Sequence, residues 1–298
     1  MSRGAGDDVS DAPTSATEAS AGDGVPEWLA YHRSERITEY DHEAFGWRAL
    51  MEDLLYTPEW PSNRANIHEV HVPVGENGTL PPDPPRYRKL MHAFRHAGWK
   101  MPKLWAEAMR PGEEKRAFAA LQASPEFTRF MDAYRRFVFE EIAPTCGDPS
   151  GVWFQSPPTI RVAMPSVAPT IKPHSDSQYD RHQKCEMNFW VPVGRAFGNN
   201  ALRVESRPGA NDFVTITLSE NQYFRFDGYN CTHFTVPNDT DYTRVSFDFR
   251  VVPASLYRPH ADANGRKKND GKIGDYRAEC TGPVALREPL RGTKPRRV

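Results

Sequence analysis

The second half of the chain is a series of short runs in which apolar and polar residues alternate, and this series restricts the fold more than any other feature. Successive side chains of a β-strand point to opposite faces, so each run predicts a half-buried strand. The runs cover 159–164, 168–174, 186–193, 201–206, 212–218, 222–227, 233–236 and 243–252, and glycine, proline and asparagine turns separate them. About eight strands at this spacing predict a sandwich or barrel and argue against a parallel α/β sheet.

Helical spacing of apolar residues precedes the strands, in 38–58 and again in 86–143. Between these two stretches, 60–85 is rich in proline, glycine and asparagine and is predicted to be irregular, with one strand near 69–74. We therefore expect helical support over about 38–143 for the strands that follow.

The clearest helix start lies at Ser124-Pro125. A serine at this position accepts a hydrogen bond from a free N–H group of the first turn, and proline suits the first helical position. The apolar residues that follow recur at helical spacing: Phe127, Phe130, Met131, Tyr134, Phe137 and Val138. This mostly aromatic stripe is expected to pack the helix against the strands rather than to bind a cofactor.

The two ends of the chain differ in composition from its middle. Residues 1–25 hold almost no large apolar side chains, which predicts a disordered tail. Residues 254–298 return to loop-forming residues and carry 11 Lys and Arg against 5 Asp and Glu. This basic extension is either a solvated tail or a segment folded over an active-site mouth. We expect one domain over 26–298, with a strand core at about 155–253.

The nearly equal numbers of acidic and basic residues argue against nucleic acids and anionic membranes as binding partners. The 298 residues include 38 Lys and Arg against 39 Asp and Glu, whereas proteins that bind nucleic acids or anionic membranes need a positive field. We find no apolar run long enough for a transmembrane helix, no apolar secretory signal and no CxxC pair among the four cysteines. We expect a cytoplasmic protein that binds a small molecule, in an oligomeric state that the sequence leaves open.

A candidate metal site begins at His174 and Asp176. In extended backbone, residues two apart project to the same side, so an imidazole nitrogen and a carboxylate oxygen can meet at one point. Such a pair alone is more often a surface histidine beside an aspartate. His233, at the start of a predicted strand, offers a third ligand. Two histidines and one carboxylate form the facial triad of non-haem Fe(II) oxygenases, which leaves other metal positions open.

Arg244 and Ser246 form a candidate carboxylate site, because on one strand they point the same way. A guanidinium is a planar fork that matches a carboxylate, and the hydroxyl can share the interaction. An arginine that faces the inside of a barrel needs an anionic partner, since a buried unpaired charge is costly. A dicarboxylate would supply that partner. Arg250 lies on the same strand face and competes with Arg244 for this role.

Taken in order, these motifs resemble those of the Fe(II)- and 2-oxoglutarate-dependent oxygenases. The chain has HSD at 174–176, THF around His233 and TRVSFDFR at 243–250, and the resemblance covers roughly 155–253. It implies a mainly β fold, a double-stranded β-helix (a cupin-like jelly roll) flanked by N-terminal helices.

The same resemblance assigns roles to the site residues. His174, Asp176 and His233 would hold Fe(II), which 2-oxoglutarate chelates. Arg244 and Ser246 would bind the distal carboxylate of 2-oxoglutarate, and the position of Arg244 after His233 favours it over Arg250. O2 would take the last metal position, with release of succinate and CO2.

The segment 185–213 resembles a bacterial subgroup from sugar and aminocyclitol antibiotic pathways, of the streptomycin and hygromycin kind. It implies an aminoglycoside or sugar-like substrate and either hydroxylation or oxidative ring closure, including closure to an orthoester. Asn188 is a candidate donor to 2-oxoglutarate, and a purely structural amide is an equal alternative. His182 is expected in a loop near the site.

Candidate substrate residues follow from the chemistry of an amino sugar, which calls for carboxylates and aromatic platforms. They are Tyr179, Asp180, Trp190, Glu205 and Arg161, with Asp248 as a further inward-facing candidate. For each of them, a solvated or structurally paired role is an alternative. Two other functions stay open. One is the same chemistry on an amino acid or another small metabolite, and the other is a non-catalytic jelly roll that binds carbohydrate or metal.

Overall fold

Two antiparallel sheets form the centre of the computed structural model, which describes residues 25–55, 122–163, 169, 171–259, 271–274, 276–287 and 293–295. The large sheet has the order β1-β7-β4-β9-β2-β11-β10, and β3 also pairs with β9; the small sheet has the order β6-β5-β8. The strands are β1 (Arg36–Glu39), β2 (Val152–Gln155), β3 (Thr159–Ala163), β4 (Met187–Pro192), β5 (Arg203–Val204), β6 (Val214–Thr215), β7 (Gln222–Phe226), β8 (His233–Phe234), β9 (Arg244–Pro253), β10 (Lys272–Ile273) and β11 (Tyr276–Cys280).

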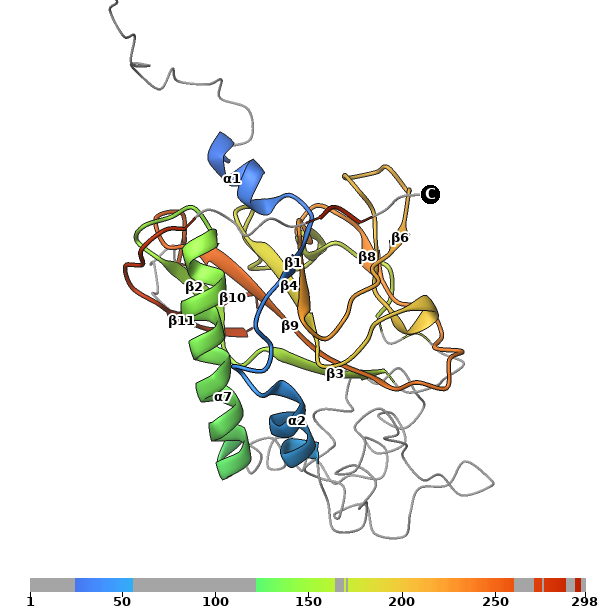
Figure 1. Cartoon of the computed structure of the whole chain (residues 1–298). Helices are drawn as coiled ribbons and strands as arrows, with labels where there is room; N and C mark the ends of the chain where they lie inside the picture. Colours follow the sequence, from blue (N-terminus) through green and yellow to red (C-terminus); the bar gives the residue numbers. More distant parts are fainter. Residues whose placement is uncertain are drawn as a thin grey trace, which may run out of the picture.

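Helices cover one side of this arrangement (Figure 1). They are α1 (Glu27–Arg33), α2 (Trp47–Leu55) and α7 (Pro125–Phe137), and α7 continues into a π-helical turn (Val138–Ile142) and a 3-10 turn (Ala143–Thr145). The prediction of a mainly β fold with helical support is confirmed for the described residues. Closure of the sheets into a double-stranded β-helix stays a prediction.

The long strand β9 separates the core from the polar interior because its side chains alternate. Val245, Phe247, Phe249 and Val251 face the helices and belong to the main apolar cluster. The Phe247 ring lies 4.9 Å from the Trp47 ring of α2 and 5.8 Å from the Phe130 ring of α7, centroid to centroid. The intervening residues, Arg244, Ser246, Asp248 and Arg250, point to the opposite face. One strand therefore anchors the helices and also presents a row of polar side chains.

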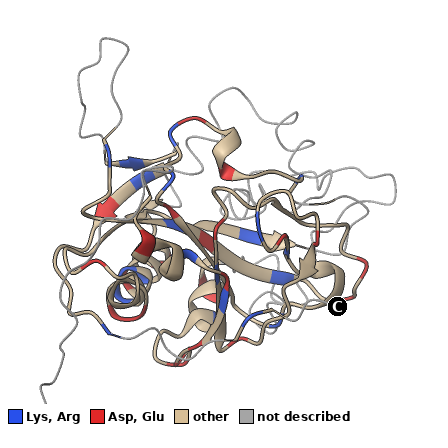
Figure 2. Ribbon diagram, turned by 90° about the horizontal axis from the view of Figure 1, so that it is seen from above, with Lys and Arg blue, Asp and Glu red and all other residues tan. Residues whose placement is uncertain are grey.

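A second apolar cluster fills the space between the large and the small sheet. Trp190 of β4 and Phe224 and Phe226 of β7 pack there against Leu202 and Val204, beside and within β5. Basic and acidic residues are intermingled along the described ribbon (Figure 2). None of the described helices has the length and apolar character needed to cross a bilayer.

The predicted helix over 38–58 is wrong at its beginning. Residues 36–39 form the edge strand β1, in which Ile37 pairs with Phe224 of β7, and the helix α2 begins only at Trp47. The edge of β7 offers unpaired backbone groups that a neighbouring segment can satisfy, and this tertiary pairing overrides a weak helical pattern.

The loop prediction for 254–298 is wrong in its middle. Strands β10 and β11 form there, and β11 pairs with β2 through Ala278 opposite Gln155 and Cys280 opposite Trp153. The strand core therefore begins at Val152 and does not end at 253. The strands predicted at 201–206, 212–218 and 233–236 are each only two residues long, as β5, β6 and β8.

Several sequence predictions fall outside the described residues. They are the disordered tail except Val25, the irregular region 60–85 with its strand, and the first part of the 86–143 helical region. The strand predicted at 168–174, of which only 168 and 170 lie outside the described residues, is not formed as a strand. His174, at the end of that last segment, makes an isolated antiparallel bridge with His233.

The predicted start of α7 is confirmed, since Ser124 Oγ accepts a hydrogen bond from the Phe127 N–H at 3.2 Å. Replacing Ser124 with alanine leaves this N–H group without its partner, and we expect a loss of about 1 kcal/mol of unfolding free energy. Urea denaturation would measure the loss. Ser124→Asp is the control, because aspartate caps as well as serine. Equal destabilisation by both variants would contradict the capping role.

Candidate metal centre

Three side chains converge at the edge of the small sheet in the way the sequence predicts. His174 and His233 are held opposite one another by paired backbone hydrogen bonds, and Asp176 begins a short 3-10 turn after His174. The Oδ1 atom of Asp176 lies 3.7 Å from His174 Nε2 and 4.0 Å from His233 Nε2. One ligand atom from each residue lies within 4.8 Å of the others. A single metal ion is therefore within reach of all three.

Backbone carbonyls determine which imidazole nitrogen faces the metal position. His174 Nδ1 lies 2.8 Å from the Lys172 carbonyl oxygen, and His233 Nδ1 lies 3.1 Å from that of Cys231. A carbonyl oxygen only accepts, so each Nδ1 donates its N–H to the backbone and Nε2 is the nitrogen that faces the metal position. Burial lowers the pKa of His233 to about 4, although Asp176 opposes this shift. The His233 imidazole is therefore neutral, as a metal ligand must be.

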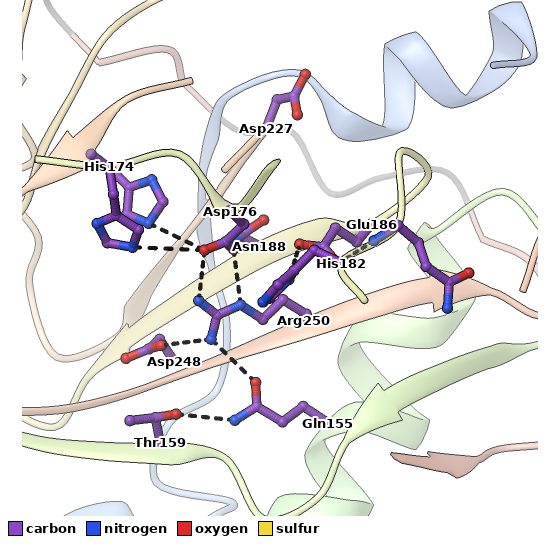
Figure 3. Close-up of polar contacts among 12 residues, drawn as sticks. Gln155, Thr159, His174, Asp176, His182, Glu186, Asn188, Asp227, Asp248 and Arg250 are labelled. Carbon is purple, nitrogen blue, oxygen red and sulfur yellow. Dashed lines mark hydrogen bonds and ion pairs between the residues drawn. The ribbon is translucent and has the colours of Figure 1, made fainter. Parts of the chain in front are cut away.

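The carboxylate of Asp176 is held from the side away from the histidines (Figure 3). Its Oδ2 atom accepts hydrogen bonds from Asn188 Nδ2 at 2.7 Å and Arg250 Nε at 3.0 Å, and its Oδ1 atom accepts one from Arg250 Nη2 at 3.1 Å. Burial alone would raise the pKa of Asp176, but Arg250 and then His233 more than offset it, so this pKa lies below its usual range. Asp176 is an anion ready to bind a cation.

Arg244 has the unpaired charge that the sequence predicts for a dicarboxylate site. Its side chain is 1% exposed, and Nη1 donates to Ser246 Oγ at 3.0 Å. Its Nε and Nη2 atoms have no hydrogen-bond partner among the described residues. Burial, and next the like charge of Arg161, lower the pKa of Arg244 to about 9. A buried cation with two donors left free by the described residues fits the distal carboxylate of 2-oxoglutarate, just as two imidazoles and one carboxylate fit Fe(II).

Trp190 and Arg161 lie near Arg244, but neither of them offers a negative charge to pair with its guanidinium. Trp190 Nε1 donates to Ser246 Oγ at 3.2 Å, and the Trp190 ring centroid lies 5.3 Å from Arg244 Cζ. Arg161 forms an ion pair with Asp248, which also lies 3.4 Å from Arg250 Nη1. These contacts favour Arg244 over Arg250 as the candidate carboxylate residue, because Arg250 already has carboxylate partners.

An open cavity of about 610 Å³ is lined by two of the three candidate ligands, His174 and Asp176. Its described lining residues are Arg161, Ile171, Lys172, His174, Asp176, Tyr179, Asp180, Arg181, His182, Arg250 and Tyr276. A narrower cavity shares Arg161, Ile171 and Arg250 with it and reaches His233, Asn188 and Trp190. The structure thus brings four of the five predicted substrate residues, Tyr179, Asp180, Trp190 and Arg161, to the cavities.

Glu205 lines neither cavity. Its carboxylate accepts hydrogen bonds from the N–H groups of Thr232 at 2.6 Å and Asn211 at 3.2 Å. Thr232 precedes His233, so Glu205 stabilises the backbone that carries a candidate ligand. Asn188 uses its Nδ2 atom on Asp176 and has an Oδ1 atom without a partner among the described residues.

Some residues of the site carried little or no signal in the sequence. Tyr276 reaches the open cavity from β11, in a segment predicted to be loop. His182 lies near the site, as the sequence predicts. Its Nδ1 atom lies 2.8 Å from Oε1 of Glu186, a partner that the sequence does not predict. Burial raises the pKa of Glu186. The face that Glu186 shares with Asn188 was the one available hint, since strand alternation places both on the same side.

Comparison with known proteins identifies one informative sequence relative. No family model matches the chain. The streptomycin biosynthesis protein StrG of Streptomyces griseus is 33% identical over 146 residues, which are 47% of this chain and 68% of the relative. The motifs and the geometry described above add an independent line of support.

Similar solved structures are more distant. The apo form of the non-heme monooxygenase ThoJ is 12% identical, covers 90% of this chain and 88% of its own, and has a TM-score of 0.39. EvdO2 from Micromonospora carbonacea var. aurantiaca in complex with 2-oxoglutarate is 16% identical over 47% of this chain and 65% of its own, with a TM-score of 0.29. The similarity to StrG and the arrangement of the site therefore carry the identification. Together they show that the chain belongs to the Fe(II)- and 2-oxoglutarate-dependent oxygenase family, among the relatives of StrG.

Proposed function

We propose that this protein is an oxygenase of antibiotic biosynthesis that oxidises an aminoglycoside or another sugar-like intermediate. The observation that carries the proposal is the convergence of His174 Nε2, His233 Nε2 and Asp176 Oδ1 on one point. StrG is named for streptomycin biosynthesis, which supports a pathway of the same kind. The product is a hydroxylated substrate or a ring closed by oxidation, of which an orthoester is one form.

When bound, Fe(II) and 2-oxoglutarate supply the oxidising chemistry, with O2 consumed and succinate and CO2 released. The residues of this chain bind and orient the reactants. His174, Asp176 and His233 hold the metal and leave other metal positions open. Arg244 and Ser246, both of which are buried, bind the distal carboxylate of 2-oxoglutarate away from bulk water.

The lining of the open cavity supports a small polar substrate. Ile171 is the one aliphatic residue among the described lining residues, which otherwise offer charged, imidazole and phenol groups. Tyr179 and Tyr276 provide aromatic surfaces of the kind that pack against sugar rings, and Asp180 provides a carboxylate for an amino group. Such a wall leaves a fatty chain with little apolar surface to contact.

Incubation with Fe(II), 2-oxoglutarate and candidate pathway intermediates tests the proposal. We expect succinate to form only in the presence of O2, and mass spectrometry to show the gain of one oxygen atom or the loss of two hydrogen atoms from the substrate. Amino acids in place of sugars are the comparison, since oxidation of an amino acid alone would overturn the substrate class. A protein that bound sugars with or without metal and formed no succinate would be a carbohydrate-binding module.

A further inference from the structure

The carboxylate of Asp176 has three of its hydrogen-bond positions filled by neighbouring side chains. Arg250 donates through Nε to Oδ2 and through Nη2 to Oδ1, at 3.0 and 3.1 Å, and Asn188 donates to Oδ2 at 2.7 Å. A carboxylate offers about four acceptor positions. The position left open belongs to Oδ1, the atom that faces the Nε2 atoms of both His174 and His233.

We propose that Arg250 and Asn188 form a clamp that positions Asp176 as a ligand through a single oxygen, and that the clamp determines the strength and geometry of metal binding. The inference rests on the metal centre of the proposed function. Arg250 and Asn188 touch no reacting atom and act through Asp176. They are therefore positioning residues.

Strand pairing brings the two donors of the clamp together. Asn188 of β4 and Arg250 of β9 stand directly opposite one another in the antiparallel ladder, so their side chains leave the sheet side by side on one face. Gly228 leaves room for the amide, because a Cβ atom at this position would lie 2.4 Å from Asn188 Cγ. The Gly228 carbonyl also accepts a hydrogen bond from the Asp176 N–H at 2.9 Å.

A further row of hydrogen bonds fixes the guanidinium of Arg250 (Figure 3). Its Nη1 atom lies 3.3 Å from Gln155 Oε1 and 3.4 Å from Asp248 Oδ2. The side-chain Nε2 of Gln155 donates in turn to Thr159 Oγ1 at 3.0 Å. The backbone carbonyl of Gln155 accepts a hydrogen bond from the Tyr134 hydroxyl of α7 at 2.6 Å. The arginine is 5% exposed. Its orientation is thus determined by the packed scaffold before any metal binds, as a precise ligand geometry requires.

Arg250→Lys tests position separately from charge, because lysine keeps the cation and loses the planar fork. We expect Co²⁺, titrated calorimetrically into the purified chain, to bind about 10- to 100-fold more weakly than to the wild type, the range found when an outer partner of a metal ligand is lost. The visible absorption spectrum of bound Co²⁺ should also change, because Asp176 is then free to rotate. Circular dichroism would show that the fold is kept.

Arg225→Lys is the matched control. Arg225 is a similarly buried arginine of β7, which pairs with β4 on the side away from β9, and it donates to the backbone carbonyls of Ser34 and Tyr31 instead of to Asp176. We expect Co²⁺ affinity and spectrum to be unchanged in this variant. Should Arg250→Lys fail to fold, Asn188→Ala removes the neutral donor of the clamp, and we expect weaker Co²⁺ binding there too.

Three results would overturn the proposal. Wild-type affinity and spectrum in both Arg250→Lys and Asn188→Ala would show that the clamp does not position the ligand. Tighter Co²⁺ binding by Arg250→Gln would show that the arginine acts by charge repulsion alone. A wild-type chain that binds no Co²⁺ at all would remove the metal centre itself, and this outcome is distinct from a failure of the clamp.

Discussion

Asp176→Ala is expected to abolish metal binding and succinate formation. The substitution removes the one carboxylate ligand of the centre and leaves two imidazoles. Loss of an outer partner already weakens metal affinity up to about 100-fold, so the loss of a direct ligand should exceed that figure. Calorimetric titration with Fe²⁺ or Co²⁺ and a succinate assay with 2-oxoglutarate would measure the two effects.

The same substitution also leaves Arg250 as a buried cation with its main partner gone. Breaking a buried ion pair by removing one partner costs about 3–5 kcal/mol of stability. The double variant Asp176→Ala/Arg250→Met removes both charges and should regain most of this stability without regaining metal. The double variant thus separates the effect of Asp176 on metal binding from its effect on stability. Full turnover by Asp176→Ala would show that another residue holds the metal.

Arg244→Met is expected to raise the KM for 2-oxoglutarate by roughly 30-fold to several thousand-fold. Loss of one partner of a buried charged hydrogen-bonded pair costs about 2–5 kcal/mol of binding free energy. Two donors of the guanidinium have no partner within the described chain, so the bound carboxylate would be their main counter-charge. Steady-state kinetics at varied 2-oxoglutarate would measure the change.

The stability of Arg244→Met should move in the opposite direction from that of Asp176→Ala. Because a buried unpaired charge is unfavourable, its replacement by an apolar side chain of similar length should preserve or raise the melting temperature without 2-oxoglutarate. Added 2-oxoglutarate should raise the melting temperature of the wild type and not that of the variant. An unchanged KM for 2-oxoglutarate would assign its carboxylate to another residue, with Arg161 the next to test.

Strand alternation alone does not distinguish Arg244 from Arg250. Both residues lie on β9, and both point to the same face, as strand alternation predicts. Their different contacts depend on which residues stand beside them in space. Arg250 meets Asp176 and Asn188, whereas Arg244 meets Ser246 and the ring of Trp190. A pattern along one strand contains no information about partners contributed by other segments.

The C-terminal strands and Glu205 illustrate the same limit. Strand β11 is established by pairing with β2, more than a hundred residues earlier, and its own sequence has little apolar alternation. Glu205 has the residue type that an amino-sugar site needs, yet its carboxylate is engaged by the backbone N–H groups of Thr232 and Asn211. In both cases the deciding contact is long-range, and local propensity does not report it.

By itself, the sequence determined the mainly β architecture and the start of α7, and it predicted the candidate site residues His174, Asp176, His233, Arg244 and Ser246. Period-two alternation and helix capping are local physics, and the ligand types are specific for their chemistry. Only the tertiary structure decided that Arg250 and Asn188 donate hydrogen bonds to Asp176, that the described residues leave two donors of Arg244 free and that β11 brings Tyr276 to the cavity. The physical reason is that hydrogen-bond satisfaction and burial depend on neighbours in space, which the packing of distant segments alone supplies.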